Sequence, residues 1–182
     1  MNIRLKRFLQ KLKLIDHLVF EISITRNDFV EQLCTIVDQK RLGFFSEILD
    51  FYSLSDNELK GIIDYGSFKV KRRRNVVNTN NGAIAYGKVI EENGNLKIEV
   101  EIVGYDARVI FFFVFLIIYE LAVIISIITT GDYNVLVFLF FAIPTFLMSA
   151  ILIFLMRQSV KKLKDELEKS LLRIKANSSK DF

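Results

Sequence analysis

One carboxylic acid lies inside the most apolar stretch of this sequence. Glu120 falls near the middle of residues 109–129, where most side chains are apolar. A charge at the bilayer centre costs roughly 2.5–3.5 kcal/mol on insertion scales, so such a carboxyl is commonly protonated, paired or exposed to a water-filled cavity. Two roles therefore stay open for Glu120. It lines an oligomeric pore or makes a proton-linked or inter-subunit contact, or it is a neutral carboxyl that holds neighbouring helices together.

Other polar side chains accompany Glu120 in this stretch and in the apolar stretch that follows. The candidate polar residues of the membrane core are Tyr119, Glu120, Ser126, Thr145 and Ser149. Pro144 is the only proline of the chain. It has no backbone N–H to donate and is expected to kink a helix. The kink would be a hinge for gating, or the membrane helix would tolerate Pro144 without any conformational switching.

These residues belong to two apolar runs, 109–129 and 135–156, with residues 130–134 between them. As helices, both runs are long enough to cross a hydrocarbon core of about 30 Å. We therefore expect a transmembrane hairpin over residues 108–157. Lys and Arg flank the hairpin on its outer sides and are missing from its loop. The positive-inside rule then predicts that both termini are cytoplasmic, and we expect the hairpin in a bacterial plasma (inner) membrane.

The densest positive charge of the chain precedes the hairpin. It consists of Lys69, Lys71, Arg72, Arg73 and Arg74. Such a run attracts anionic head groups or a phosphorylated ligand, or it is a solvated strand edge that resists aggregation. The only aromatic residue interleaved with or next to this run is Phe68, directly before it, so the pattern does not favour nucleic acid as a partner.

The residue types needed for enzymatic chemistry are scarce. His17 is the only histidine and Cys34 the only cysteine, so we expect no metal site and no intramolecular disulfide. The sequence has no Gly-x-Ser-x-Gly motif and no phosphate-binding glycine loop followed by lysine. We therefore predict that the protein is not an enzyme, has no catalytic residues and needs no cofactor.

Residues 16–107 are expected to form a cytoplasmic α+β domain, an antiparallel sheet with one or two helices. Period-two alternation predicts a strand over 17–25, and Asn27 or Asp28 is expected to cap a helix that reaches about Gln39. A meander should follow over 58–103, because Asn93-Gly94 suits the type I′ turn of a β-hairpin.

Two amphipathic segments flank these parts. Residues 1–15 are basic and amphipathic, and would lie on the inner leaflet, on the protein's own domain or on the C-terminal helix. Residues 158–176 are expected to form a cytoplasmic amphipathic helix whose apolar stripe needs a partner, either the domain or a second copy. Residues 177–182 are expected to be a loose tail.

The strand and turn motifs at 63–72, 85–90 and 93–100 resemble those of uncharacterised small bacterial membrane proteins. Those proteins join a cytoplasmic α+β domain to two transmembrane helices, and the resemblance implies the same architecture here. The layout is also similar to that of membrane effectors in bacterial anti-phage systems, which fuse a small β-rich sensor to a few spans. No functional residue is carried over from either resemblance.

Together these features predict a non-enzymatic binding domain held at the inner membrane surface. Its partners would be the lipid bilayer, further copies of the chain through the hairpin or the C-terminal helix, and a cytoplasmic protein or small anionic ligand. The alternative is a ligand-gated oligomeric effector whose hairpins form a pore or disrupt the membrane.

Overall fold

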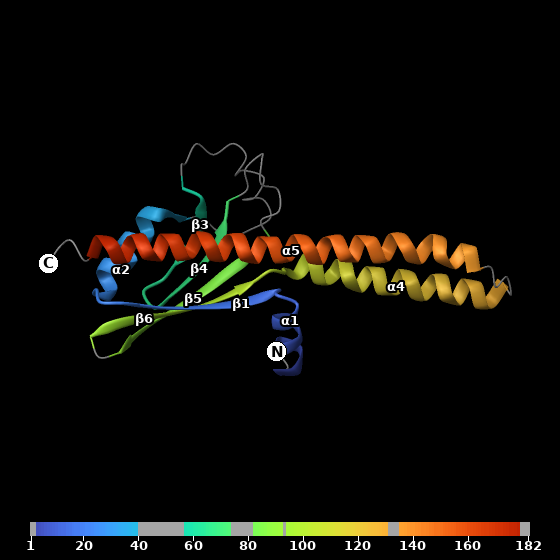
Figure 1. Ribbon diagram of the computed structural model, residues 1–182, viewed down its shortest axis with the longest axis horizontal. Coiled ribbons are helices and arrows are strands. Elements are labelled where there is room, and N and C mark those ends of the chain that lie inside the picture. The colour runs from blue at the N-terminus through green and yellow to red at the C-terminus, as the bar shows by residue number, and fades with distance from the viewer. Residues whose placement is uncertain (1–2, 40–56, 74–81, 93, 131–134, 179–182) are drawn as a thin grey trace. The chain divides into compact units, whose positions relative to one another are not determined.

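The computed structural model describes residues 3–39, 57–73, 82–92, 94–130 and 135–178, and has the expected α+β class (Figure 1). Its elements are α1 (Ile3–Lys11), β1 (Ile15–Ile22), α2 (Arg26–Ile36), β2 (Val37–Gln39), β3 (Leu59–Ile63), β4 (Ser67–Arg72), β5 (Ile84–Glu92), β6 (Asn95–Val103), α4 (Ala107–Thr130) and α5 (Val135–Ser178). Arg74 and most of the hairpin loop lie outside the described residues, as does the last part of the expected tail.

The six strands form one sheet in the order β1-β6-β5-β4-β3-β2. Neighbouring strands are antiparallel except β2 and β3, which pair in parallel with Val37 opposite Leu59. The sheet is therefore mixed, whereas the sequence predicted an antiparallel one. The difference comes from β2, whose three residues were expected to be the end of a helix and are too few for a period-two pattern.

Helix α2 begins before the predicted cap. The N-cap residue is Thr25, and its Oγ1 accepts a hydrogen bond from the backbone N–H of Asp28 at 3.2 Å. The same hydroxyl donates to Asp28 Oδ2 at 2.6 Å. The prediction of Asn27 or Asp28 as the cap was therefore wrong, because Thr25 provides the capping oxygen and Asp28 lies in the first turn, where its charge is favourable.

Strands β5 and β6 form the predicted hairpin. Glu92 pairs with Asn95, so the connection consists of residues 93 and 94 alone. Gly94 has a φ of +79°, in the left-handed region that a type I′ turn requires and that glycine adopts without strain. The hairpin places alternate β6 residues, from Leu96 to Ile102, in the core.

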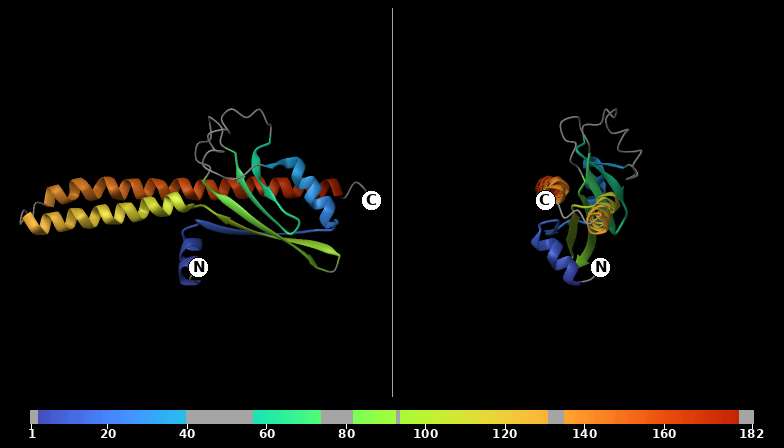
Figure 2. Two further views of the ribbon diagram at one scale, coloured as in Figure 1. Left: turned by 180° about the vertical axis from the view of Figure 1, so that it is seen from behind. Right: turned by 90° about the vertical axis from the view of Figure 1, so that its right-hand side faces the viewer.

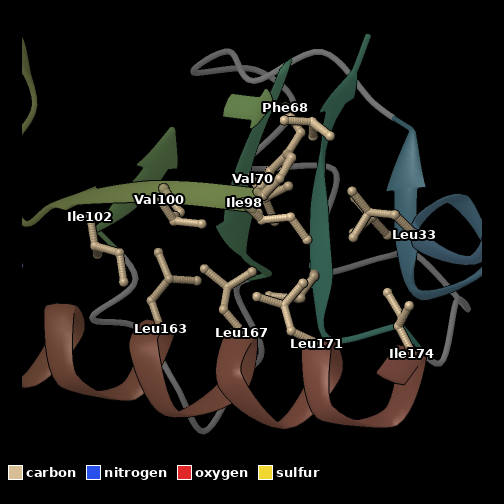
Figure 3. Close-up of a cluster of buried hydrophobic side chains, with 14 of the residues drawn as sticks. Leu33, Phe68, Val70, Ile98, Val100, Ile102, Leu163, Leu167, Leu171 and Ile174 are labelled. Carbon is tan, nitrogen blue, oxygen red and sulfur yellow. The ribbon is translucent and has the colours of Figure 1, made fainter. Parts of the chain in front are cut away.

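The C-terminal part of α5 packs against the sheet and completes its core (Figure 3). Its buried stripe is Val160, Leu163, Leu167, Leu171 and Ile174. These side chains point toward the strands, where Ile98, Val100 and Ile102 of β6 are also buried. Helix α2 adds Phe29 and Leu33 to the same core. The sequence left two partners open for the stripe, the domain or a second copy. In the structure the stripe packs against the protein's own sheet.

The chain divides into two compact units. Residues 1–104 and 156–182 make up the sheet domain, and residues 105–155 make up the helical hairpin. Among the described residues, two helices, α4 and α5, are long and apolar enough to cross a membrane, and the hairpin contains α4 and residues 135–155 of α5. Their large apolar side chains are exposed rather than buried, among them Phe111 and Phe140 at 74%. Exposure of this kind is typical of a surface that contacts lipid.

Candidate functional site

The sheet has one face that α2 and α5 do not cover, called the open face below, and α1 contacts it at Glu101 and His17. Cross-strand pairing places a row of five residues along it, one from each of five strands. They are Ile62, Lys69, Tyr86, Glu101 and His17 in spatial order. A second row beside it contains Ser67, Lys88, Glu99 and Val19. The open face therefore mixes apolar residues with charges of both signs.

Tyr86 lies near the middle of the first row and is 45% exposed. The Nζ atom of Lys69 lies 5.2 Å from the centre of its ring, a cation–π contact. Val19 and Ile62 are also exposed, at 57% and 42%. Tyrosine is one of the residue types enriched in protein–protein interfaces.

The basic run of the sequence does not form one exposed patch. Successive strand residues point to opposite faces, so Arg72 lies on the covered face, where its Nη2 binds Glu58 Oε2 at 3.1 Å. Lys71 and Arg73 lie on the other face but are only 4% exposed. Lys69 is half-buried beside Tyr86, and Arg74 is outside the described residues. This arrangement does not favour a head-group site made of the whole run.

Sequence reasoning missed a buried basic group at one end of the open face. Lys60 is 1% exposed and lies opposite Lys71 in the pairing of β3 with β4. Arg73 Nη1 lies 3.5 Å from Asp38 Oδ2, which partly neutralises this group. No local signal identified Lys60, because a lone lysine in a strand is expected to be solvated.

Three of the predicted membrane-core residues come together in the hairpin. Glu120 of α4 lines a shallow groove of about 260 Å³ with Thr145 and Ser149 of α5. The remaining lining is apolar: Phe113, Leu116, Ile117 and Leu121. Glu120 Oε1 is buried and has no hydrogen-bond partner among the residues that the structure describes. The groove therefore contains a buried carboxyl oxygen that no described residue satisfies.

The other hairpin residues of interest have separate surroundings. Thr145 Oγ1 donates to the Phe141 carbonyl at 3.0 Å, so its proton is already used within α5. The ring of Tyr119 packs edge-on against Phe141, with centroids 6.3 Å apart. Ser126 does not line the groove. Pro144 is inside α5, which is helical on both sides of it.

Polar contacts also attach α5 to the sheet. Lys164 Nζ lies 2.9 Å from Asp16 Oδ2. Partial burial would raise the pKa of Asp16, but the Lys164 ammonium and the backbone N–H of His17 outweigh it and lower the pKa. Further along α5, partial burial and the adjacent Glu58 carboxyl raise the pKa of Glu166. These groups lie beside the core and not on the open face.

A second concave region lies where β1 meets α2. It has a volume of about 510 Å³ and is lined by Ser23, Thr25, Asp28, Gln32 and Glu91 among others. Arg26 Nη2 lies 3.7 Å from Glu91 Oε2 and offsets its charge. This region was not predicted from the sequence, because its residues come from distant segments. It offers hydrogen-bonding oxygens but no pairing of a nucleophile with a base.

The histidine and the cysteine also lie apart from each other. His17 Nε2 is 2.9 Å from Gln10 Nε2, and the half-buried Cys34 accepts a hydrogen bond from Gln39. Among the described residues, no group of three or more His, Cys, Asp or Glu side chains could hold a metal ion.

Comparisons with protein-family models, curated proteins and solved structures found no match to this chain.

Proposed function

We propose that this protein is an integral membrane protein whose sheet domain is a non-enzymatic interaction module at the cytoplasmic surface of a bacterial inner membrane. The observation that carries the proposal is that α5 belongs to both units. Its first part is apolar and exposed, as lipid contact requires, and its last part supplies the buried stripe of the domain core. Anchoring and folding of the domain therefore depend on one helix.

The second connection between the two units is also short. Strand β6 ends at Val103 and α4 begins at Ala107, so only residues 104–106 lie between them. A domain attached through such a connection and through a continuous helix stays near the membrane. This favours a module that captures its partner at the membrane surface.

The partner that best fits the open face is a protein. A small anion would need convergent cations, but Lys71 and Arg73 are buried and Arg72 lies on the other face. The exposed rows instead alternate charge, with Lys97 Nζ bound to Glu99 Oε1 at 3.0 Å, around the exposed ring of Tyr86. Such a mixed surface is complementary to another mixed protein surface.

A photo-crosslinking amino acid at position 86, introduced in intact cells, tests this function. We expect one discrete protein adduct, and we expect Lys88→Glu in the neighbouring row to reduce its yield. The control is the same crosslinker at Tyr65, which is 59% exposed but belongs to neither row. The proposal fails if position 86 gives no adduct, or the same adducts as position 65, in mass spectrometry of the purified protein.

A second candidate function, an oligomeric membrane effector, is favoured by the unpartnered Oε1 of Glu120. The sequence offered two surfaces for self-association, and the stripe of α5 is already buried against the sheet. The hairpin groove is then the remaining surface for self-association. A second copy that supplies a donor to Glu120 would relieve the cost of an unsatisfied buried oxygen.

Glu120→Gln separates this candidate from a simple anchor. For an effector, native mass spectrometry in lipid nanodiscs should detect a ring of several copies, and expression should depolarise the membrane. Both effects should be lost in Glu120→Gln and kept in Glu168→Gln, a control on the exposed surface of α5. A monomer or dimer without depolarisation would reject the effector and leave the anchored module.

A further inference from the structure

We infer that α1 (Ile3–Lys11) is an interfacial helix that lies on the inner leaflet and fixes the sheet domain to anionic lipid. This inference rests on the proposed membrane location of the hairpin. It concerns the surface of α1, which is not part of either apolar span. The binding partner of α1 is the lipid surface itself. Acyl chains contact the apolar side of α1, and head-group phosphates lie near its cations.

Helix α1 contacts the sheet through polar side chains. Lys6 Nζ forms an ion pair with Glu101 Oε1 at 2.8 Å, and Gln10 Nε2 lies 2.9 Å from His17 Nε2. Lys6 and Gln10 are four residues apart, so they lie on the same side of the helix. Figure 2 shows α1 at the β1 edge of the sheet. A helix that docks by its polar side leaves its apolar side uncovered.

The apolar side of α1 is exposed at Leu5 and Phe8 and half-buried at Leu9 and Leu12. Leu5, Phe8, Leu9 and Leu12 recur at spacings of three and four residues, which aligns them on one side of a helix. No residue of α1 is buried, and Leu5 and Phe8 are 50% and 57% exposed. An aligned and exposed apolar stripe of this kind is the property that draws a helix into a membrane interface.

The charges of α1 select lipid over a second copy of the same helix. Residues 3–11 contain Arg4, Lys6, Arg7 and Lys11 and no acidic residue. Two such helices placed side by side would repel each other. Anionic head groups instead attract cations near the surface.

Hydrogen bonds place the end of α1 where the chain enters and leaves the hairpin. The Leu12 carbonyl accepts from Arg157 Nε at 2.7 Å, and the Leu14 carbonyl accepts from the Gly104 N–H at 2.8 Å. Gly104 and Met156 are the domain residues bonded directly to the hairpin unit. Because these bonds keep the end of α1 close to both chain connections to the hairpin, we expect α1 to reach the head groups.

The chain has no tryptophan, so one introduced tryptophan reports on one position. The full-length Phe8→Trp protein is reconstituted into phosphatidylglycerol-containing liposomes, with and without brominated acyl chains. We expect blue-shifted emission that loses most of its intensity in the brominated lipid. The matched control is Arg7→Trp, on the polar side of α1, which should emit as in water and be quenched little.

A third variant, Phe115→Trp in α4, separates this inference from the proposed membrane location. If Phe115→Trp is quenched and Phe8→Trp is not, the hairpin is inserted and the inference about α1 is wrong. If Phe115→Trp is not quenched, the membrane location itself fails. Blue-shifted but unquenched emission from Phe8→Trp would mean that protein covers α1, which also overturns the inference.

Discussion

Replacing Leu167 with alanine is expected to lower the free energy of unfolding of the sheet domain by about 2–5 kcal/mol. Leu167 is fully buried at the middle of the α5 stripe, between Leu163 and Leu171, and faces the strands (Figure 3). Truncation removes apolar contacts and leaves a cavity that the helix and the sheet cannot both close. Urea unfolding of the full-length protein in nanodiscs, followed by hydrogen exchange in β5 and β6, measures the loss.

Leu172→Ala is the matched control for this prediction. It makes the same substitution on the same helix, but Leu172 is 50% exposed, so we expect a change within about 0.5 kcal/mol. Membrane insertion should be unaffected in both variants, because residues 109–129 and the apolar part of α5 are unchanged. Equal stability of the two variants would show that the stripe does not contribute to the domain core.

Gly61→Ala is expected to disrupt the pairing of β3 with β4 at a cost of about 3 kcal/mol, the upper part of the range for overpacked cores. A Cβ atom at Gly61 would overlap the carbonyl oxygen of Lys69, and it would lie 2.9 Å from the Cα of Val70. Both are backbone atoms of the neighbouring strand, opposite Gly61 in the pairing. The strands must therefore separate, because no side-chain rotation relieves the overlap.

Gly66→Ala tests whether this effect is specific to the close approach. A Cβ atom at Gly66, between β3 and β4, meets nothing within 4 Å. We expect Gly66→Ala to unfold at nearly the same urea concentration as the original protein, and Gly61→Ala at a clearly lower one. A similar loss in both variants would mean that glycine itself, and not the contact with β4, is needed in this region.

Much of the fold could be predicted because its signals are local. The apolar spans follow from composition, and the strands β3 to β6 follow from alternation and turn residues. The β5–β6 hairpin and the positive φ of Gly94 were predicted correctly, because positive φ is a property of single residues. The cap of α2 was wrong by a few residues, since several neighbouring side chains could supply the capping oxygen.

The candidate site was harder to predict, because cross-strand neighbours are distant in sequence. The row that includes Lys69, Tyr86 and His17 exists only after five strands are paired. The basic run was treated as one cluster, yet the pleat sends Arg72 to one face and Lys71 and Arg73 to the other. Its charges therefore contribute to two different surfaces.

The sequence by itself determined the α+β class, the two apolar helices with Glu120 near the middle of the first, and the amphipathic character of α1 and the end of α5. These follow from the order and spacing of residues along one element. Only the tertiary structure decided that the α5 stripe packs on the sheet, that β2 pairs in parallel, and that α1 docks through Lys6 and Gln10. Amphipathicity shows that a face needs a partner, but contacts between distant segments choose it.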